Sequence, residues 1–290
     1  MSTPAAVPQS MKLTKTHKLI LIVLFFVCGL LVFLVGGYLA TVPRSTRTVI
    51  KVGLPLLFLA VTVILYRSVR FKAYWQIAFA FCVASVGFLV AWLLSSWLLA
   101  MMNVSTTTMA GLAITKFVDA LLIVVPIIVL VKITGSDMGT LYLKRGDLKL
   151  GLLIGGITFT AFAILFFLQT QDKGFSTGQI VAWIPWILIF VLSNAFMEEL
   201  HFRGLFLGKL EPFLGRGFAN LTVAIVFTLV HAPVEYTPDI IQFLAILFFF
   251  ALAWGYVIQK TDSLWGSVLF HAGADLLIIV GILQSFGGMQ

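Results

Sequence analysis

One stretch, Ser193-Asn-Ala-Phe-Met-Glu-Glu-Leu-His-Phe-Arg-Gly204, places two adjacent carboxylates, an imidazole and a guanidinium inside a run that is otherwise apolar. A charged side chain at the middle of a bilayer costs roughly 2.5–3.5 kcal/mol even on the lenient insertion scale, so such groups tend to face a bundle interior or a wet cavity. On a helix, Glu199 and Arg203 are four residues apart and share a face, as an ion pair requires, while Glu198 is turned about 100° away. The spacing predicts that Arg203 holds one carboxylate while Glu198 faces a cavity.

The composition around this stretch is that of a membrane protein. The 290 residues are 61% hydrophobic and 10% charged, with a mean hydropathy of +1.10. A soluble domain is about 45–50% apolar and about 25% charged, so this chain has more apolar surface than a soluble core can hide. The net charge of +8 could suggest nucleic acid, but Lys and Arg lie in short clusters between apolar runs, as topology signals do. We therefore expect membrane lipids as partners and no nucleic acid.

The apolar runs predict the helices. A basic leader, residues 1–18, precedes a first run that is longer than the roughly 7–15 residues of a signal peptide's hydrophobic region, which indicates a retained anchor. Cys28 and Cys82 lie inside apolar runs, so no disulfide framework or thiolate metal site is indicated. The chain is predicted to be all-α, a polytopic transmembrane bundle of about eight to nine spans. These spans cover about 19–42, 49–66, 73–102, 112–131, 150–168, 180–210, 217–232, 240–258 and 263–284.

The Lys and Arg residues of the connections predict the orientation. If the N-terminus is cytoplasmic, the positive charges gather in the inner connections, except for those of the first outer loop. The polar connection 132–149 is the one plausible internal division. It separates residues 19–149, transmembrane helices of unclear role, from residues 150–290, which contain every intramembrane residue of the candidate site.

Two more polar pairs follow in apolar segments, Phe227-Thr-Leu-Val-His231 and His271-Ala-Gly-Ala-Asp275. The second pair has i,i+4 spacing, which stacks imidazole and carboxyl on one helix face. At about 1.5 Å per residue, Glu198 and His231 lie about 18 and 21 Å above the same membrane face, in a core about 30 Å thick. His271 and Asp275 lie about 12 and 18 Å above the same face. Similar depth on three helices predicts that these groups meet.

The three polar segments, taken together, resemble a known motif set. Glu-Glu-x-x-x-Arg, Phe-x-x-x-His and His-x-x-x-Asn/Asp, in this order on successive apolar segments, are similar to the motifs of the CPBP family of intramembrane glutamic endopeptidases. This family includes the type II CAAX prenyl proteases and Abi-type proteins. The resemblance covers about residues 180–285, and the first five spans resemble nothing that we can name.

The resemblance implies a role for each motif residue. A metal-free glutamate mechanism is implied, in which the first Glu and the second-motif His act on water and the last pair stabilises the tetrahedral intermediate. Carried over, the catalytic residues are Glu198, His231, His271 and Asp275, and the supporting ion pair is Glu199 and Arg203. The expected protein is multi-pass in a bacterial or archaeal cell membrane.

One residue departs from the pattern, because Asp275 stands where the better-studied members carry Asn. An amide always offers a donor, whereas an ionised carboxylate offers none. Asp275 is therefore either protonated through burial or orients His271 without touching the substrate. A zinc ion held by His231, His271 and Glu198 is a third alternative, although no His-Glu-x-x-His occurs and no cofactor is expected.

Three functions remain open at this level. The first is an intramembrane endopeptidase that cuts a peptide or protein, lipidated or plain, near the membrane surface. The second is a non-catalytic scaffold or a bacteriocin-immunity-type protein of the same family. The third is a proton-coupled transporter, since buried carboxylates with histidines also form proton relays. His201 lies three residues after Glu198 and could join the site, but it belongs to no motif.

Overall fold

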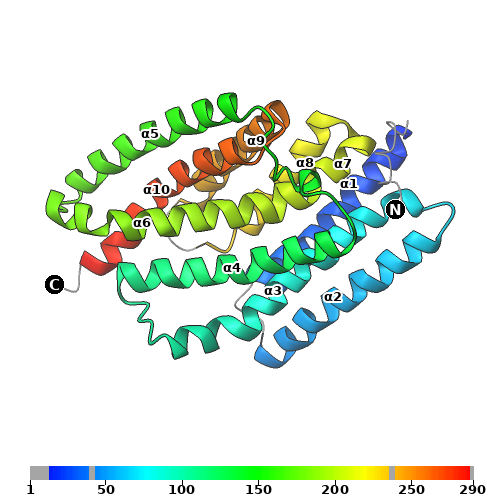
Figure 1. Ribbon diagram of the computed structural model, residues 1–290, viewed down its shortest axis with the longest axis horizontal. Helices are drawn as coiled ribbons and strands as arrows, with labels where there is room; N and C mark the ends of the chain where they lie inside the picture. Colours follow the sequence, from blue (N-terminus) through cyan, green and yellow to red (C-terminus); the bar gives the residue numbers. More distant parts are fainter. Residues whose placement is uncertain (1–12, 39–42, 235–238, 288–290) are drawn as a thin grey trace.

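The computed structural model describes residues 13–38, 43–234 and 239–287, and these are helical with no strand among them (Figure 1). Most of the leader, residues 1–12, lies outside the described residues. Two helices continue into π-helical turns, Leu30–Tyr38 after α1 and Glu199–Gly204 after α6. The α-helices are α1 Lys15–Gly29, α2 Arg44–Arg67, α3 Trp75–Met101, α4 Met109–Ile133, α5 Leu148–Asp172, α6 Thr177–Glu198, α7 Leu205–Leu214, α8 Arg216–Val230, α9 Ile240–Thr261 and α10 Trp265–Gly287.

Eight helical segments of the described chain are long and apolar enough to cross a membrane. The prediction of an all-α transmembrane bundle with about eight to nine spans is thereby confirmed. The interpretation of residues 217–232 as a full span is wrong, because α8 has 15 residues and is about 22 Å long, less than the core thickness of about 30 Å. The helix α6, its π-helical turn and α7 form one continuous segment, Thr177–Leu214.

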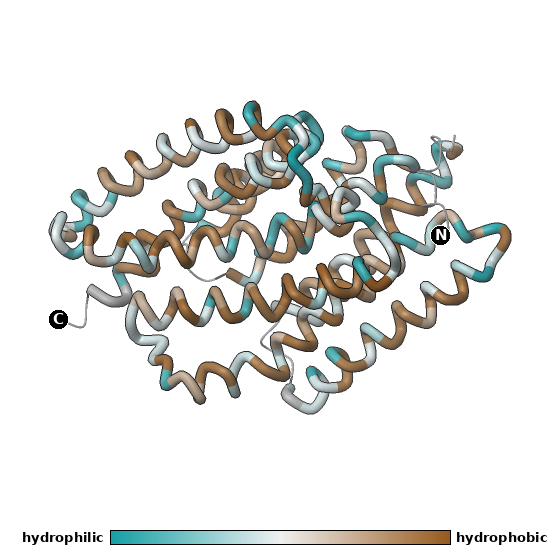
Figure 2. The backbone as a smooth tube through the Cα atoms, in the orientation of Figure 1, coloured by the Kyte–Doolittle hydropathy of each residue, from teal (hydrophilic) through white to brown (hydrophobic). Residues whose placement is uncertain are grey.

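Three polar connections lie together at one end of the bundle, namely those that join α4 to α5, α7 to α8 and α9 to α10. Lys144 pairs with Asp262 at 2.5 Å, and the Tyr142 hydroxyl donates to Glu211 at 3.3 Å. Burial, and next the Glu211 carboxylate, raise the pKa of Tyr142, so that its hydroxyl stays protonated and can donate. Figure 2 shows hydrophilic colour at these connections and hydrophobic colour along the helices. The start of α1 lies at this end too, since His17 borders the same pocket as Tyr74, whose ring stacks on Phe213 near the end of α7.

The helix α10 is the most enclosed of the spans, with 67% of its spanning window buried. It packs against α5, α6 and α9. Glycines allow the close approach of α5, because a Cβ on Gly155 would lie 2.6 Å from the carbonyl oxygen of Gly266 and 2.8 Å from Cβ of Leu269. Gly156, the next residue, has no atom within 4 Å of its Cβ position. The contact fixes α10, which carries the third motif, against α5.

We expect Gly155→Ala to destabilise the protein and Gly156→Ala to leave it unchanged or slightly more stable. Overpacking costs about 1–3 kcal/mol, whereas alanine is intrinsically better than glycine in an open helical position. Thermal unfolding in detergent should show a melting temperature about 2–10 °C lower for Gly155→Ala. Equal melting temperatures for the two variants would contradict this account of the α5–α10 contact.

Candidate active site

The central motif lies in the π-helical turn Glu199–Gly204, whose six residues are all buried. Such turns are rare and occur mostly as single-turn bulges inside α-helices, frequently at functional sites. The other π-helical segment, Leu30–Tyr38, packs against this turn, since Phe33 stacks on Phe202 with ring centroids 4.1 Å apart. The turn begins directly after Glu198, the last residue of α6, so the two adjacent carboxylates belong to different helical geometries.

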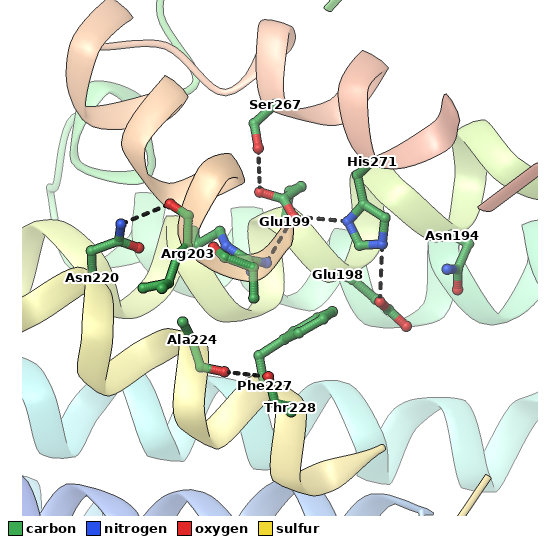
Figure 3. A network of polar contacts seen from close by, with 12 residues as sticks. Asn194, Glu198, Glu199, Arg203, Asn220, Ala224, Phe227, Thr228, Ser267 and His271 are labelled. Atoms are coloured by element: carbon green, nitrogen blue, oxygen red, sulfur yellow. Dashed lines mark hydrogen bonds and ion pairs between the residues drawn. The ribbon is translucent and has the colours of Figure 1, made fainter. Parts of the chain in front are cut away.

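The carboxylate of Glu199 is fully buried and accepts from three side chains (Figure 3). Its Oε1 lies 2.7 Å from Nη1 of Arg203 and 2.8 Å from Nδ1 of His271. Its Oε2 accepts from the hydroxyl of Ser267 at 2.7 Å. A buried charge is tolerated when it is paired and its remaining lone pairs are hydrogen-bonded, and Glu199 meets both conditions.

The guanidinium of Arg203 is held on its other sides as well. It is fully buried, and its Nη2 donates to the carbonyl oxygen of Ala251 on α9 at 3.2 Å. The group also lies over the ring of Phe227, 4.5 Å from the centroid, and over Trp254, 5.3 Å from it. These cation–π contacts join α8 and α9 to the same charge pair.

The structure brings Glu198, His231, His271 and Asp275 together around one cavity of about 280 Å³. Oε2 of Glu198 lies 3.6 Å from Nε2 of His271 and 3.9 Å from Nε2 of His231. The same Nε2 of His271 lies 3.5 Å from Oδ1 of Asp275. The cavity lies among α4, α6, α8, α9 and α10. Its lining extends along α10 to Ile282, about 25 Å beyond the start of this helix and away from the polar connections.

Hydrogen bonds at Nδ1, the ring nitrogen that points away from Glu198, orient the imidazoles of His231 and His271. Nδ1 of His271 faces the Glu199 carboxylate, and Nδ1 of His231 faces the carbonyl oxygen of Phe227 at 2.7 Å. Because these oxygens only accept, Nδ1 carries a proton in each ring and Nε2 is directed at Glu198. Trp254 also stacks on His271, with centroids 3.8 Å apart and planes 8° from parallel. The face that each ring turns toward Glu198 is therefore set by contacts with Glu199, Trp254 and the carbonyl oxygen of Phe227.

The sequence motifs do not include several residues that lie at the site. Asn194 donates from Nδ2 to Oδ2 of Asp275 at 2.9 Å, and Lys116 of α4 lines the cavity with its ammonium 5.3 Å from the ring of Phe190. Asn194 lies four residues before Glu198, and Ser267 four before His271, which is a visible spacing signal. No local pattern marks Trp254 or Lys116, which reach the site from separate helices.

His201 lies outside the cavity. Its ring packs between Phe33 and Phe88, with centroids 4.9 and 4.8 Å away, and its Nε2 is 3.2 Å from the carbonyl oxygen of Ala84. The side chain is 1% exposed. It therefore packs the π-helical turn against the N-terminal helices and takes no part in the candidate site.

The three residues of the zinc alternative face one another, but they do not form a ligand set. Within the part of the chain that the structure describes, no group of three or more His, Cys, Asp or Glu side chains is arranged to hold a metal ion. Zinc needs nitrogen and oxygen ligands at about 2.0–2.2 Å in tetrahedral geometry. The described side chains of the cavity are not arranged in this way.

The fold and the site together define an integral, multi-pass membrane protein with a buried cluster of carboxylates and imidazoles around a cavity. Residues 180–277 match the family model described as "Type II CAAX prenyl endopeptidase Rce1-like". The match covers about a third of the chain, contains all three motifs and confirms the resemblance seen in the sequence. It points to a protease of the CAAX type. No curated protein and no solved structure matches the chain.

We expect the two adjacent glutamates to differ in their importance for stability. Glu199→Gln leaves the buried guanidinium of Arg203 uncompensated, which costs about 3–5 kcal/mol. Glu198→Gln removes a carboxylate whose ion-pair contacts with His271 and His231 are 3.6 and 3.9 Å long. Thermal unfolding in detergent should show a melting temperature about 6–12 °C lower for Glu199→Gln and a small change for Glu198→Gln. Equal losses in the two isosteric variants would refute this division.

Proposed function

We propose that the protein is an intramembrane endopeptidase that hydrolyses a peptide bond with a water molecule activated by Glu198 and His231. The observation that carries the proposal is the convergence of Glu198 with two imidazole Nε2 atoms on one cavity inside the bundle. The family match over the same segment supports it. Metal independence and the roles below are parts of this proposal.

The first step is attack of water on the scissile carbonyl. Glu198 accepts a proton from the water while the water oxygen bonds to the carbonyl carbon, and His231 hydrogen-bonds the water through Nε2. Both groups lie within reach of one water, since they are 3.9 Å apart. A positioned general base of this kind contributes about 10²–10⁴-fold to a rate.

The second step is stabilisation and collapse of the tetrahedral intermediate. In its imidazolium form, His271 donates from Nε2 to the oxyanion while Nδ1 stays on Glu199. Asp275 supports this ring from 3.5 Å. Glu198 then returns its proton to the departing nitrogen, the C–N bond breaks, and a carboxylic acid and an amine leave. Glu198 is again ionised.

The side chains that line the cavity support a class of substrate. Apolar side chains such as Phe190, Phe243 and Ile278 line it beside the polar cluster. An extended peptide with apolar side chains fits such a site, and we propose a peptide or protein segment at the membrane as the substrate class. The orientation stays a prediction, with the N-terminus in the cytoplasm. So does the division of the chain at residue 149.

The decisive experiment compares the wild type with Glu198→Gln and His231→Ala in detergent. Quenched fluorescent peptides, prenylated and plain, are the substrates, and each assay is run with and without a chelator. We expect the wild type to cleave a subset of the peptides. Each variant should lose at least about 10²-fold in kcat/KM, and chelation should change nothing.

His201→Gln serves as the matched control, because it alters a buried imidazole that does not face the cavity. It should retain cleavage if it folds. Loss of activity on chelation would replace the glutamate mechanism with a metal-dependent one. No cleavage by a folded wild type would favour the scaffold function and make the buried charges a device for stability.

A further inference from the structure

One face of α6 presents three residues to the cavity at intervals of four. Phe190, Asn194 and Glu198 all line it, as side chains at i, i+4 and i+8 of a helix can. Phe190 supplies apolar surface and Glu198 the carboxylate. Asn194 lies between them and takes no part in the two proposed reaction steps. Asn194 and Glu198 both belong to α6, and Figure 3 labels them in one view with His271.

The amide of Asn194 is only half engaged. Its Nδ2 donates one N–H to Oδ2 of Asp275 at 2.9 Å, which is the only hydrogen bond of this side chain within residues 13–38, 43–234 and 239–287. A primary amide has two N–H groups, so one donor is left. The side chain is half-buried and lines the cavity, which makes this donor accessible to a bound substrate.

Asp275 uses both of its oxygens to orient donors. Oδ2 accepts from Asn194, and Oδ1 faces Nε2 of His271 at 3.5 Å. An ionised carboxylate has no hydrogen to offer an oxyanion. The amide that it holds does have one, and the acceptor-only carboxylate also decides that the amide presents nitrogen, not oxygen, on that side.

We propose that Asn194 is a catalytic residue, whose second N–H donates to the oxyanion of the tetrahedral intermediate beside His271. Asp275 is then a positioning residue that fixes the amide of Asn194 and the ring of His271. This inference rests on the proposed endopeptidase function and changes the division of labour within it. The neutral donor of the oxyanion site comes from α6, while α10 contributes its acceptor.

The test removes the donor in one variant and relocates it in another. Asn194→Leu replaces the amide with an apolar group of similar size, and we expect kcat to fall about 10²–10³-fold, as for loss of one oxyanion donor, with little change in KM. Asp275→Asn keeps one oxygen that can accept from Asn194 but loses the second acceptor, so we expect kcat to fall less than in Asn194→Leu.

The exchange variant Asn194→Asp with Asp275→Asn keeps the pair's composition and reverses its direction. The amide introduced on α10 would then donate to the carboxylate introduced on α6 and offer its second N–H to the oxyanion. Asn194→Asp alone should lose activity, and the exchange should recover at least roughly tenfold of it, as a coupled pair does in a double-mutant cycle. Ser193→Ala, a neighbour that does not line the cavity, is the control and should behave as wild type.

Each result decides between the proposals. A folded Asn194→Leu variant with the kcat of the wild type would overturn the role of Asn194 and leave the endopeptidase standing. So would a larger loss of kcat in Asp275→Asn than in Asn194→Leu, which would show that the charge of Asp275 is itself required. Failure of the exchange variant to recover activity at wild-type thermal stability would overturn it too. A wild type that cleaves no peptide would overturn both proposals together.

Discussion

The buried carboxylate of Glu199 joins the parts of the site. It ties its own π-helical turn to α10 through Ser267 and His271, and to α9 through Arg203, which reaches Ala251. Taking such a charge out of water costs several kcal/mol, which is compensated only when partners surround it. Three donors within 2.8 Å do so here. The orientation of the His271 ring, and with it the face directed at Glu198, depends on this one carboxylate.

Two neighbouring glutamates therefore do different things because the helix changes its geometry between them. Glu198 ends α6 and lines the cavity, whereas Glu199 begins the π-helical turn and turns into the packed interior. Three polar groups at the cavity have a hydrogen-bond partner that orients them: Glu199 for His271, the carbonyl oxygen of Phe227 for His231, and the amide of Asn194 for Asp275. Such support gives a site rigid geometry before a substrate arrives.

Much of this could be predicted, because composition and periodicity are local properties. Apolar length predicts the bundle, and the four-residue spacings place Glu199 beside Arg203 and His271 beside Asp275. What could not be predicted depends on packing between distant segments. Nothing in the sequence shows that a π-helical turn follows Glu198 or that Trp254 stacks on His271. The catalytic roles stay predictions, since geometry alone measures no reaction.

The cavity extends toward one end of the bundle. Its lining extends from the mid-helix cluster to Val234, Phe243 and Ile282, away from the end where Lys144, Glu211 and Asp262 meet. Under the proposed function, the water that is split at Glu198 would enter from the side of the bundle opposite the polar connections. A substrate with its cleavable segment on that side would reach Glu198, whereas one with the same segment beside the polar connections would not. The membrane topology of a substrate would then select it before its sequence does.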